Sequence, residues 1–263
     1  MTFSPAHRGG EGTPLVLLHG FTDTWRTWEP VLPALERRFE VFAPTLPGHA
    51  GGPAFADGEE AGDEAIVDAL EAQLDELGWE APAVVGNSLG GFVALRLAQR
   101  GRARSVVAIA PAGGWVDGDP AIATTLSYFR KMAVLVRQAT PHADAIASTP
   151  EGRAQATAAI ATNTDHVSTD LVGTLIRGAA ACDSGPLLAF AEREGWQIEA
   201  ERITCPLRFV WGTEEQLLGL PEAAARYRAD FPQAEWIEIE GAGHCPQLDH
   251  PTETAELIAG FST

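Results

Sequence analysis

The sequence predicts an α/β fold: a doubly wound, mostly parallel sheet with an inserted helical lid. Continuous apolar runs, typical of buried parallel strands, alternate along the chain with segments whose apolar residues recur at helical spacing. This alternation stops between residues 113 and 181 and then resumes. We therefore expect a core of residues 1–112 and 182–263, with residues 113–181 forming the lid.

Each predicted strand of the core is a short apolar run. The runs cover residues 14–19, 40–44, 83–85, 105–110, 207–211 and 234–239. Helices are expected between them where apolar residues recur at helical spacing, and Gly78 supplies a stop for one of them. These core helices cover residues 28–35, 63–77, 92–98, 221–230 and 252–261.

Only helices are predicted in the lid. They cover residues 119–139, 151–162 and 168–181, and prolines interrupt the helical pattern between them. The first helix carries too many apolar side chains for one narrow stripe: Ile122, Leu126, Phe129, Met132, Leu135 and Val136. Because a helix that is apolar all round should be buried, we expect most of these side chains to pack against the core.

The composition describes an acidic globular chain with a substantial core. The chain has 263 residues, 45% of them apolar, and a formal net charge of −18. That charge argues against a nucleic-acid partner, because phosphate binding requires a basic face. The three cysteines are too few and too scattered for a disulfide framework, and they lack the spacing of a zinc site. We expect no metal.

Nothing in the sequence indicates a membrane. The first eight residues lack the apolar core of a signal peptide, and no apolar run approaches the length of a membrane span. The expectation is a soluble cytoplasmic protein without a membrane partner. The sequence contains no signal for a particular oligomeric state.

The most informative stretch is residues 86–90, which read Gly-Asn-Ser-Leu-Gly. An ordinary tight turn also fits this short pattern, but the apolar run before it and the helical run after it are typical of a nucleophile elbow. In such an elbow the serine hydroxyl stands above the sheet, and small residues allow the sharp turn. Ser88 is therefore the candidate nucleophile.

Four motifs, each after the expected element, make the chain resemble the α/β-hydrolase superfamily over essentially its whole length. They are His-Gly-Phe at 19–21, the elbow at 86–90, Trp-Gly-Thr-Glu-Glu at 211–215 and Gly-Ala-Gly-His at 241–244. The family's order of nucleophile, acid and histidine falls on Ser88, Glu215 and His244. Histidine titrates near neutral pH and suits the role of the base. No cofactor is implied.

The acid departs from the commoner family pattern, which has Asp three residues beyond the glycine of this loop. This chain has Glu215 there, and glutamate is an accepted acid in the fold. Glu214, Asp117 and, with least support, Asp183 remain alternatives. The resemblance also implies that the backbone N–H groups of Phe21 and Leu89 form an oxyanion hole.

The resemblance carries two further expectations about structure. Relatives usually have two antiparallel strands before the His-Gly strand, whereas the dozen residues available here leave room for one, so we expect about seven strands. His19 and His49 lie in family-like loops and should make structural hydrogen bonds. The other histidines, His7, His142, His166 and His250, fit surface or core positions.

The resulting hypothesis is a serine hydrolase that cleaves a small to medium carboxylic ester through an acyl-enzyme. Trp25, Trp115 and Phe129, with Leu89, are expected to line an apolar acyl pocket. Alternatives within the fold are a cofactor-free perhydrolase and a C–C bond hydrolase. C–C bond hydrolases usually carry Trp shortly after the histidine, whereas this chain has Cys245 and no Trp there. Epoxide hydrolases and dehalogenases use Asp where Ser88 stands. A non-catalytic ligand receptor is the alternative of another class.

Overall fold

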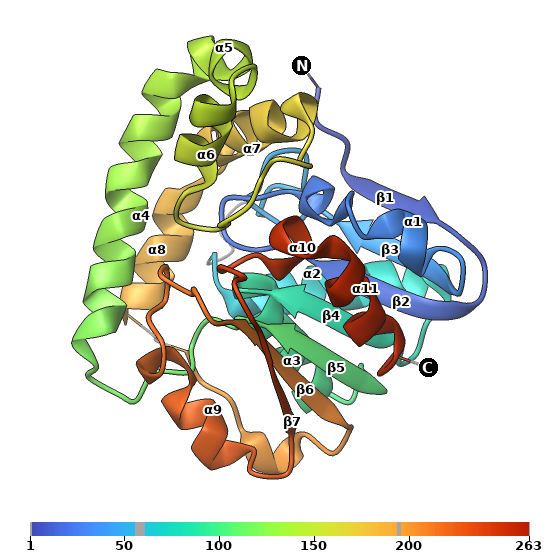
Figure 1. Cartoon of the computed structure of the whole chain (residues 1–263). Helices are drawn as coiled ribbons and strands as arrows, with labels where there is room; N and C mark the ends of the chain where they lie inside the picture. Colours follow the sequence, from blue (N-terminus) through green and yellow to red (C-terminus); the bar gives the residue numbers. More distant parts are fainter. Residues whose placement is uncertain (1, 56–60, 194–195, 263) are drawn as a thin grey trace.

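A seven-stranded sheet runs through the centre of the computed structural model, which describes residues 2–55, 61–193 and 196–262 (Figure 1). The strand order is β1-β3-β2-β4-β5-β6-β7, and every neighbouring pair is parallel except β1 and β3. The strands are β1 Ala6–Gly9, β2 Thr13–Leu18, β3 Phe39–Pro44, β4 Ala83–Asn87, β5 Ser105–Ile109, β6 Leu207–Gly212 and β7 Glu235–Ile239. The expected doubly wound sheet of about seven strands is confirmed.

Strand β1 is the one strand that precedes β2 among the described residues. It pairs antiparallel with β3, from Ala6 opposite Pro44 to Gly9 opposite Val41. The short segment before β2 therefore supplies a single edge strand, as its length predicted.

Helices cover both faces of the sheet, and the side chains of β2 show how the two cores divide. Val16 and Leu18 point into a core formed with α2, α3 and α9, whereas Leu15 and Leu17 point into a core formed with α1 and α11. The helices are α1 Leu32–Leu35, α2 Asp63–Leu77, α3 Leu89–Gln99, α9 Ala225–Asp230 and α11 Pro251–Ala259. Burial on both faces explains the continuously apolar strands.

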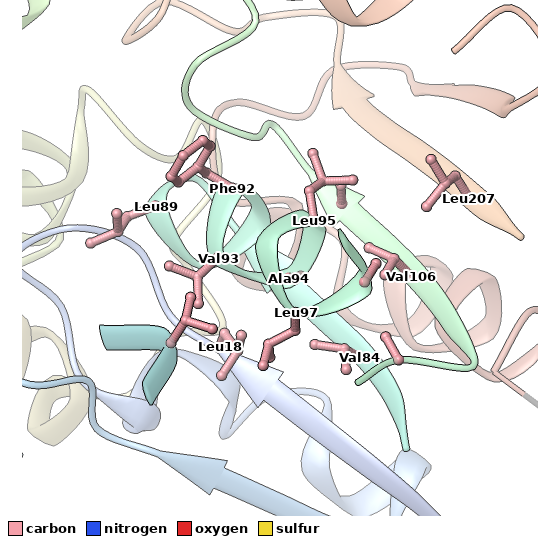
Figure 2. Packing of buried hydrophobic residues seen from close by; sticks show 14 of the residues in the cluster. Leu18, Val84, Leu89, Phe92, Val93, Ala94, Leu95, Leu97, Val106 and Leu207 are labelled. Carbon is pink, nitrogen blue, oxygen red and sulfur yellow. The ribbon is translucent and has the colours of Figure 1, made fainter. Parts of the chain in front are cut away.

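Helix α3 lies at the centre of the larger core. Every residue from Leu89 to Gln99 is buried. Figure 2 shows Val93 and Leu97 facing Leu18 and Val84 of the neighbouring strands, with Phe92 on the other side of the helix. The helix begins directly after Ser88, three residues earlier than its apolar pattern predicted. This packing fixes the start of α3 relative to the sheet.

The remaining helices form a layer beside the carboxyl ends of the strands (Figure 1). They are α4 Pro120–Ala139, α5 Ala143–Ala147, α6 Pro150–Thr157, α7 Thr169–Ala181, α8 Ser184–Arg193 and α10 Pro246–Asp249. Short 3₁₀ turns are η1 Trp25–Trp28, η2 Thr140–His142, η4 Glu222–Ala224 and η3 Ala200–Arg202, the last of which packs against α3 instead. The sequence predicted neither α5 nor α8. Leu188 of α8 packs against Leu126 of α4, so the helical layer continues past residue 181.

The expectation that most of the six apolar side chains of α4 pack against the core is wrong, because Met132, Leu135 and Val136 belong to none of the hydrophobic clusters of the described residues. Leu126 is buried, but Ile122 and Phe129 are only partly buried and Leu135 is 54% exposed. The residues at 122, 126 and 129 are spaced as one helical stripe, and this stripe faces the core. Val134 and Leu135, each 54% exposed, lie off this stripe and face solvent.

None of the helices in the described parts of the chain combines the length and hydropathy that crossing a bilayer requires.

The tight contact between the elbow and β2 predicts a large cost for Gly90→Ala. A Cβ at position 90 would lie 2.2 Å from the carbonyl oxygen of Leu18, which is backbone and cannot move aside. We expect a loss of about 1–3 kcal/mol or more in the free energy of unfolding, although alanine is the better helix former. Gly185→Ala in α8, where no heavy atom lies within 4 Å, is the matched control. Equal urea midpoints for the two variants would contradict this packing.

Candidate active site

Ser88 occupies a sharp turn between β4 and α3, in a backbone conformation that side chains rarely adopt. Its φ is 56° and its ψ is −116°. The surrounding backbone holds this strain, because the Ser88 N–H donates to the carbonyl of Ile109 at 2.9 Å and the Ser88 carbonyl accepts from Phe92 at 3.1 Å and Ala112 at 3.0 Å. The turn has the conformation of a nucleophile elbow.

The loop after β2 approaches Ser88 from the neighbouring strand. A Cβ at Gly20 would lie 3.3 Å from the Cβ of Ser88, so Gly20 lies against the Ser88 side chain. The following Phe21 lines the same pocket as Ser88. Leu89 is the first residue of α3, and its N–H therefore has no partner within the helix. From β2 the chain continues to β3 at one side of the sheet, whereas from β4 it continues to β5 at the other side, so the strand order reverses between β2 and β4. Open α/β sheets bind ligands at such a reversal.

Glu215 and His244 form a buried pair. His244 Nδ1 lies 2.5 Å from Glu215 Oε2, and both side chains are almost fully excluded from solvent. The other carboxylate oxygen, Oε1, accepts the N–H groups of Leu217 at 2.7 Å and Leu218 at 2.9 Å. These bonds fix the carboxylate and leave Nε2 of His244 as the ring nitrogen that can accept a proton.

The loops that carry the pair are joined by their backbones. Gly212 ends β6, and a Cβ there would lie 2.1 Å from the carbonyl oxygen of Ala242. Beyond it, Thr213 donates to the carbonyl of Ile239 at 3.0 Å and Glu214 to that of Ala242 at 2.9 Å. The loop after β6 is therefore held directly against the loop that precedes His244.

The other candidate acids lie away from His244. Glu214 and Asp183 are exposed. The Asp117 side chain is 91% exposed and lies 3.9 Å from Arg226. Of the four carboxylates that the sequence offered, Glu215 is the one that contacts the imidazole.

The electrostatics of Glu215 favour its charged form. Burial by itself would raise the pKa of this carboxyl, but the charge and hydrogen bond of His244, together with the N–H groups of Leu218 and Leu217, outweigh that effect. The net result is a pKa below the ordinary value for glutamate.

Asn87 connects the elbow to the histidine loop, a role that the sequence analysis missed. Its Nδ2 donates to the carbonyl of His244 at 2.9 Å and to that of Ile109 at 3.2 Å, and its Oδ1 accepts from the thiol of Cys245 at 3.2 Å. The only sequence signal for this role is that Asn87 directly precedes Ser88. Two of its hydrogen-bond partners lie more than 150 residues away in the chain, so local spacing does not reveal them.

His19 and His49 make structural hydrogen bonds, as expected. His19 Nε2 accepts the N–H of Leu46 at 2.9 Å while Nδ1 donates to the Gly20 carbonyl at 2.8 Å. His49 Nδ1 donates to the Pro47 carbonyl at 3.0 Å. Burial lowers the pKa of both imidazoles, so both are neutral near pH 7.

An apolar pocket opens beside Ser88. It has an empty volume of about 640 Å³, part of it open to solvent, and Leu89, Trp115 and Phe129 line it as predicted. Its wall also includes residues that sequence reasoning did not assign to it: Ile66, Leu187, Leu188, Phe190, Trp196 and Leu218. Most of these come from α8 and the segment after it, for which the sequence analysis predicted no element.

Trp25 does not line this pocket, contrary to expectation. Its ring stacks on His7 at 5.1 Å between ring centroids and packs at the edge of the core formed with α1 and α11. The η1 turn that carries Trp25 directs it toward β1, a strand whose pairing could not be placed from sequence.

No group of three or more His, Cys, Asp or Glu side chains in the described ranges is arranged to hold a metal ion.

The environment of Asp23, two residues beyond Phe21, should make the free energy of unfolding depend on pH. Burial raises the pKa of Asp23 to about 7, and hydrogen bonds from Thr24 and Thr27 offset this only in part. Between the ordinary aspartate value and pH 7 the folded protein holds more protons than the unfolded chain, so this contribution to stability falls as pH rises. Asp23→Asn should weaken that fall in chemical unfolding measured from pH 4 to 8. Asp165→Asn, which removes an exposed carboxylate, is the control, and identical slopes in all three proteins would contradict the assignment.

Comparison with known proteins identifies the family. The chain is 34% identical over 199 residues to the epoxide hydrolase EphH of Mycobacterium tuberculosis, covering 74% of this chain and 92% of that protein. It is 28% identical over 253 residues to a pimeloyl-(acyl-carrier protein) methyl ester esterase of Aromatoleum aromaticum, covering 93% and 96%. A thermophilic esterase from Thermogutta terrifontis shares the fold, with a TM-score of 0.71 at 20% identity over 97% of this chain and 91% of that one. Residues 15–257 match the alpha/beta hydrolase family, and the chain belongs to that family.

Proposed function

We propose that the protein is a serine hydrolase that cleaves carboxylic esters with small to medium acyl groups through an acyl-enzyme at Ser88. The observation that carries the proposal is the buried Glu215–His244 hydrogen bond beside a serine elbow that borders an apolar pocket. Family membership and the relatives support a hydrolase. The ester substrate and the serine mechanism are our proposal.

The first half of the reaction forms the acyl-enzyme. His244 Nε2 takes the proton of the Ser88 hydroxyl as Oγ attacks the ester carbonyl carbon. Glu215 holds the other ring nitrogen and stabilises the imidazolium that forms. The negative charge on the carbonyl oxygen is held by the N–H groups of Phe21 and Leu89, each worth about 3–4 kcal/mol in comparable sites.

The first half ends when His244 gives its proton to the departing alcohol and the acyl group remains on Ser88 Oγ. The second half releases the acid. Water then attacks the acyl carbon while His244 again accepts a proton, and collapse of the second tetrahedral intermediate restores the serine hydroxyl. The apolar pocket suits an uncharged acyl chain, because the walls offer few partners for a charged group.

Epoxide hydrolysis, suggested by the name of one relative, is less well supported by the residue at the elbow. A carboxylate that opens an epoxide forms an ester, which water can cleave. A serine hydroxyl would form an ether instead, which the same histidine and water could not hydrolyse. Ser88 therefore favours acyl substrates over epoxides.

Replacing the nucleophile should abolish turnover. Ser88→Ala removes the atom that forms the acyl-enzyme, so hydrolysis of p-nitrophenyl acetate and butyrate should fall by at least about 10³-fold. Circular dichroism and the melting temperature check that the variant is folded. Equal rates for the native chain and a folded Ser88→Ala variant would remove Ser88 from the mechanism.

The neighbouring glutamates give a matched pair for testing the acid. Glu215→Gln keeps the shape but loses the charge that stabilises the imidazolium, so kcat should fall by about 10²–10⁴-fold. Glu214→Gln changes an exposed carboxylate and should leave kcat within about twofold. Similar losses in both variants, or none in Glu215→Gln, would contradict the assignment of the acid.

A further inference from the structure

A buried carboxylate five residues after His244 has no part in the chemistry described so far. Asp249 ends α10 and is 4% exposed. An isolated carboxylate is costly to bury, so its position requires several hydrogen bonds. The partners of its two oxygens lie on two different segments of the chain.

One oxygen of Asp249 holds the histidine loop. Oδ2 accepts the N–H of Gly243 at 2.7 Å, and Gly243 directly precedes His244. A Cβ at Gly243 would lie 3.3 Å from the same oxygen, so the loop approaches the carboxylate closely. A charged acceptor makes this bond stronger than one between neutral groups.

The other oxygen holds the loop between α6 and α7, which we call the 158–168 loop. Oδ1 accepts the N–H groups of Thr162 at 2.7 Å and Asn163 at 2.8 Å. The Thr162 hydroxyl lies 3.2 Å from Oδ1 and donates its one proton at shorter range, 2.6 Å, to the carbonyl of Gly241. One carboxylate thus joins a loop of the helical layer to the loop that carries His244.

Two further hydrogen bonds connect the same loops on the other side of His244. Cys245 donates its N–H to the carbonyl of Ile160 at 2.7 Å. His166 Nε2 lies 2.5 Å from the carbonyl oxygen of Leu248. The residues immediately before and after His244 are therefore both bonded to Asp249 or to the 158–168 loop.

We propose that Asp249 is a positioning residue, which sets the place of His244 by fixing its loop to the 158–168 loop. This inference rests on the proposed function, because it assigns a role to Asp249 in that reaction. Its consequence is that the helical layer contributes to proton transfer as well as to the pocket. A displacement of the imidazole by about 1 Å can reduce the rate by about 10²-fold without changing how the acyl chain is bound.

The test compares two isosteric substitutions of carboxylates that both accept backbone N–H groups. Asp249→Asn removes the charge and one acceptor at the histidine loop. Asp119→Asn makes the same change at the N-terminus of α4, where Asp119 accepts the N–H of Ala121 at 2.8 Å. With p-nitrophenyl butyrate, Asp249→Asn should lower kcat by about 10- to 100-fold and leave KM within about twofold. Asp119→Asn should leave both constants within about twofold.

The outcomes separate positioning from stability and from failure of the proposed function. A folded Asp249→Asn variant with native kcat, or one in which only KM rises, would overturn the inference. If Asp249→Asn does not fold, Thr162→Val serves as the second variant, because it replaces an exposed hydroxyl with an isosteric methyl group. This variant should lower kcat by about two- to tenfold at unchanged KM. Native kcat in Thr162→Val would also overturn the inference. Ser88→Ala is measured in parallel, because activity that survives there refutes the proposed function itself.

Discussion

The buried hydrogen bond between Glu215 and His244 is the interaction on which the proposed chemistry depends. Burial of a carboxylate is costly, and this one is tolerated because the imidazole and two backbone N–H groups occupy its oxygens. The same bonds fix the proton on Nδ1 and leave Nε2 to act as the base. The backbone contact between Gly212 and Ala242 brings the two loops together, so the geometry of the pair is set by the ends of β6 and β7.

The rest of the site divides between the core around the sheet and the helical layer. Ser88 and the two proposed oxyanion donors belong to turns that pack against β2, β4 and the fully buried helix α3. The walls of the pocket come largely from α4, α8 and the segment after α8. In the proposed reaction, this division would let the layer determine which acyl group fits while the core holds the reacting groups. The bonds of Asp249 are the place where the two parts meet at the histidine.

The sequence predicted the sheet well and singled out the candidate residues of the site, because both leave local signals. Continuous apolar runs marked the parallel strands, and short motifs after them marked Ser88, Glu215 and His244. It did not predict α8, whose apolar residues lie close to Gly185 and Pro186, nor the position of Trp25, which depends on how β1 pairs. The roles of Asn87 and Asp249 were also hidden, since their hydrogen bonds join segments far apart in the chain and leave no pattern in local spacing.

Covalent trapping is the sharpest test of the proposed serine mechanism, because it reports on the serine, the histidine and the carboxylate together without any choice of ester. The native protein is incubated with a fluorophosphonate, and the adduct is located by intact mass and peptide mapping. We expect one adduct per chain on Ser88, with a labelling rate that falls by about 10²-fold or more when Glu215 is replaced by Gln. A folded protein that forms no adduct at Ser88, or forms it equally fast without the Glu215 carboxylate, would refute the proposed mechanism.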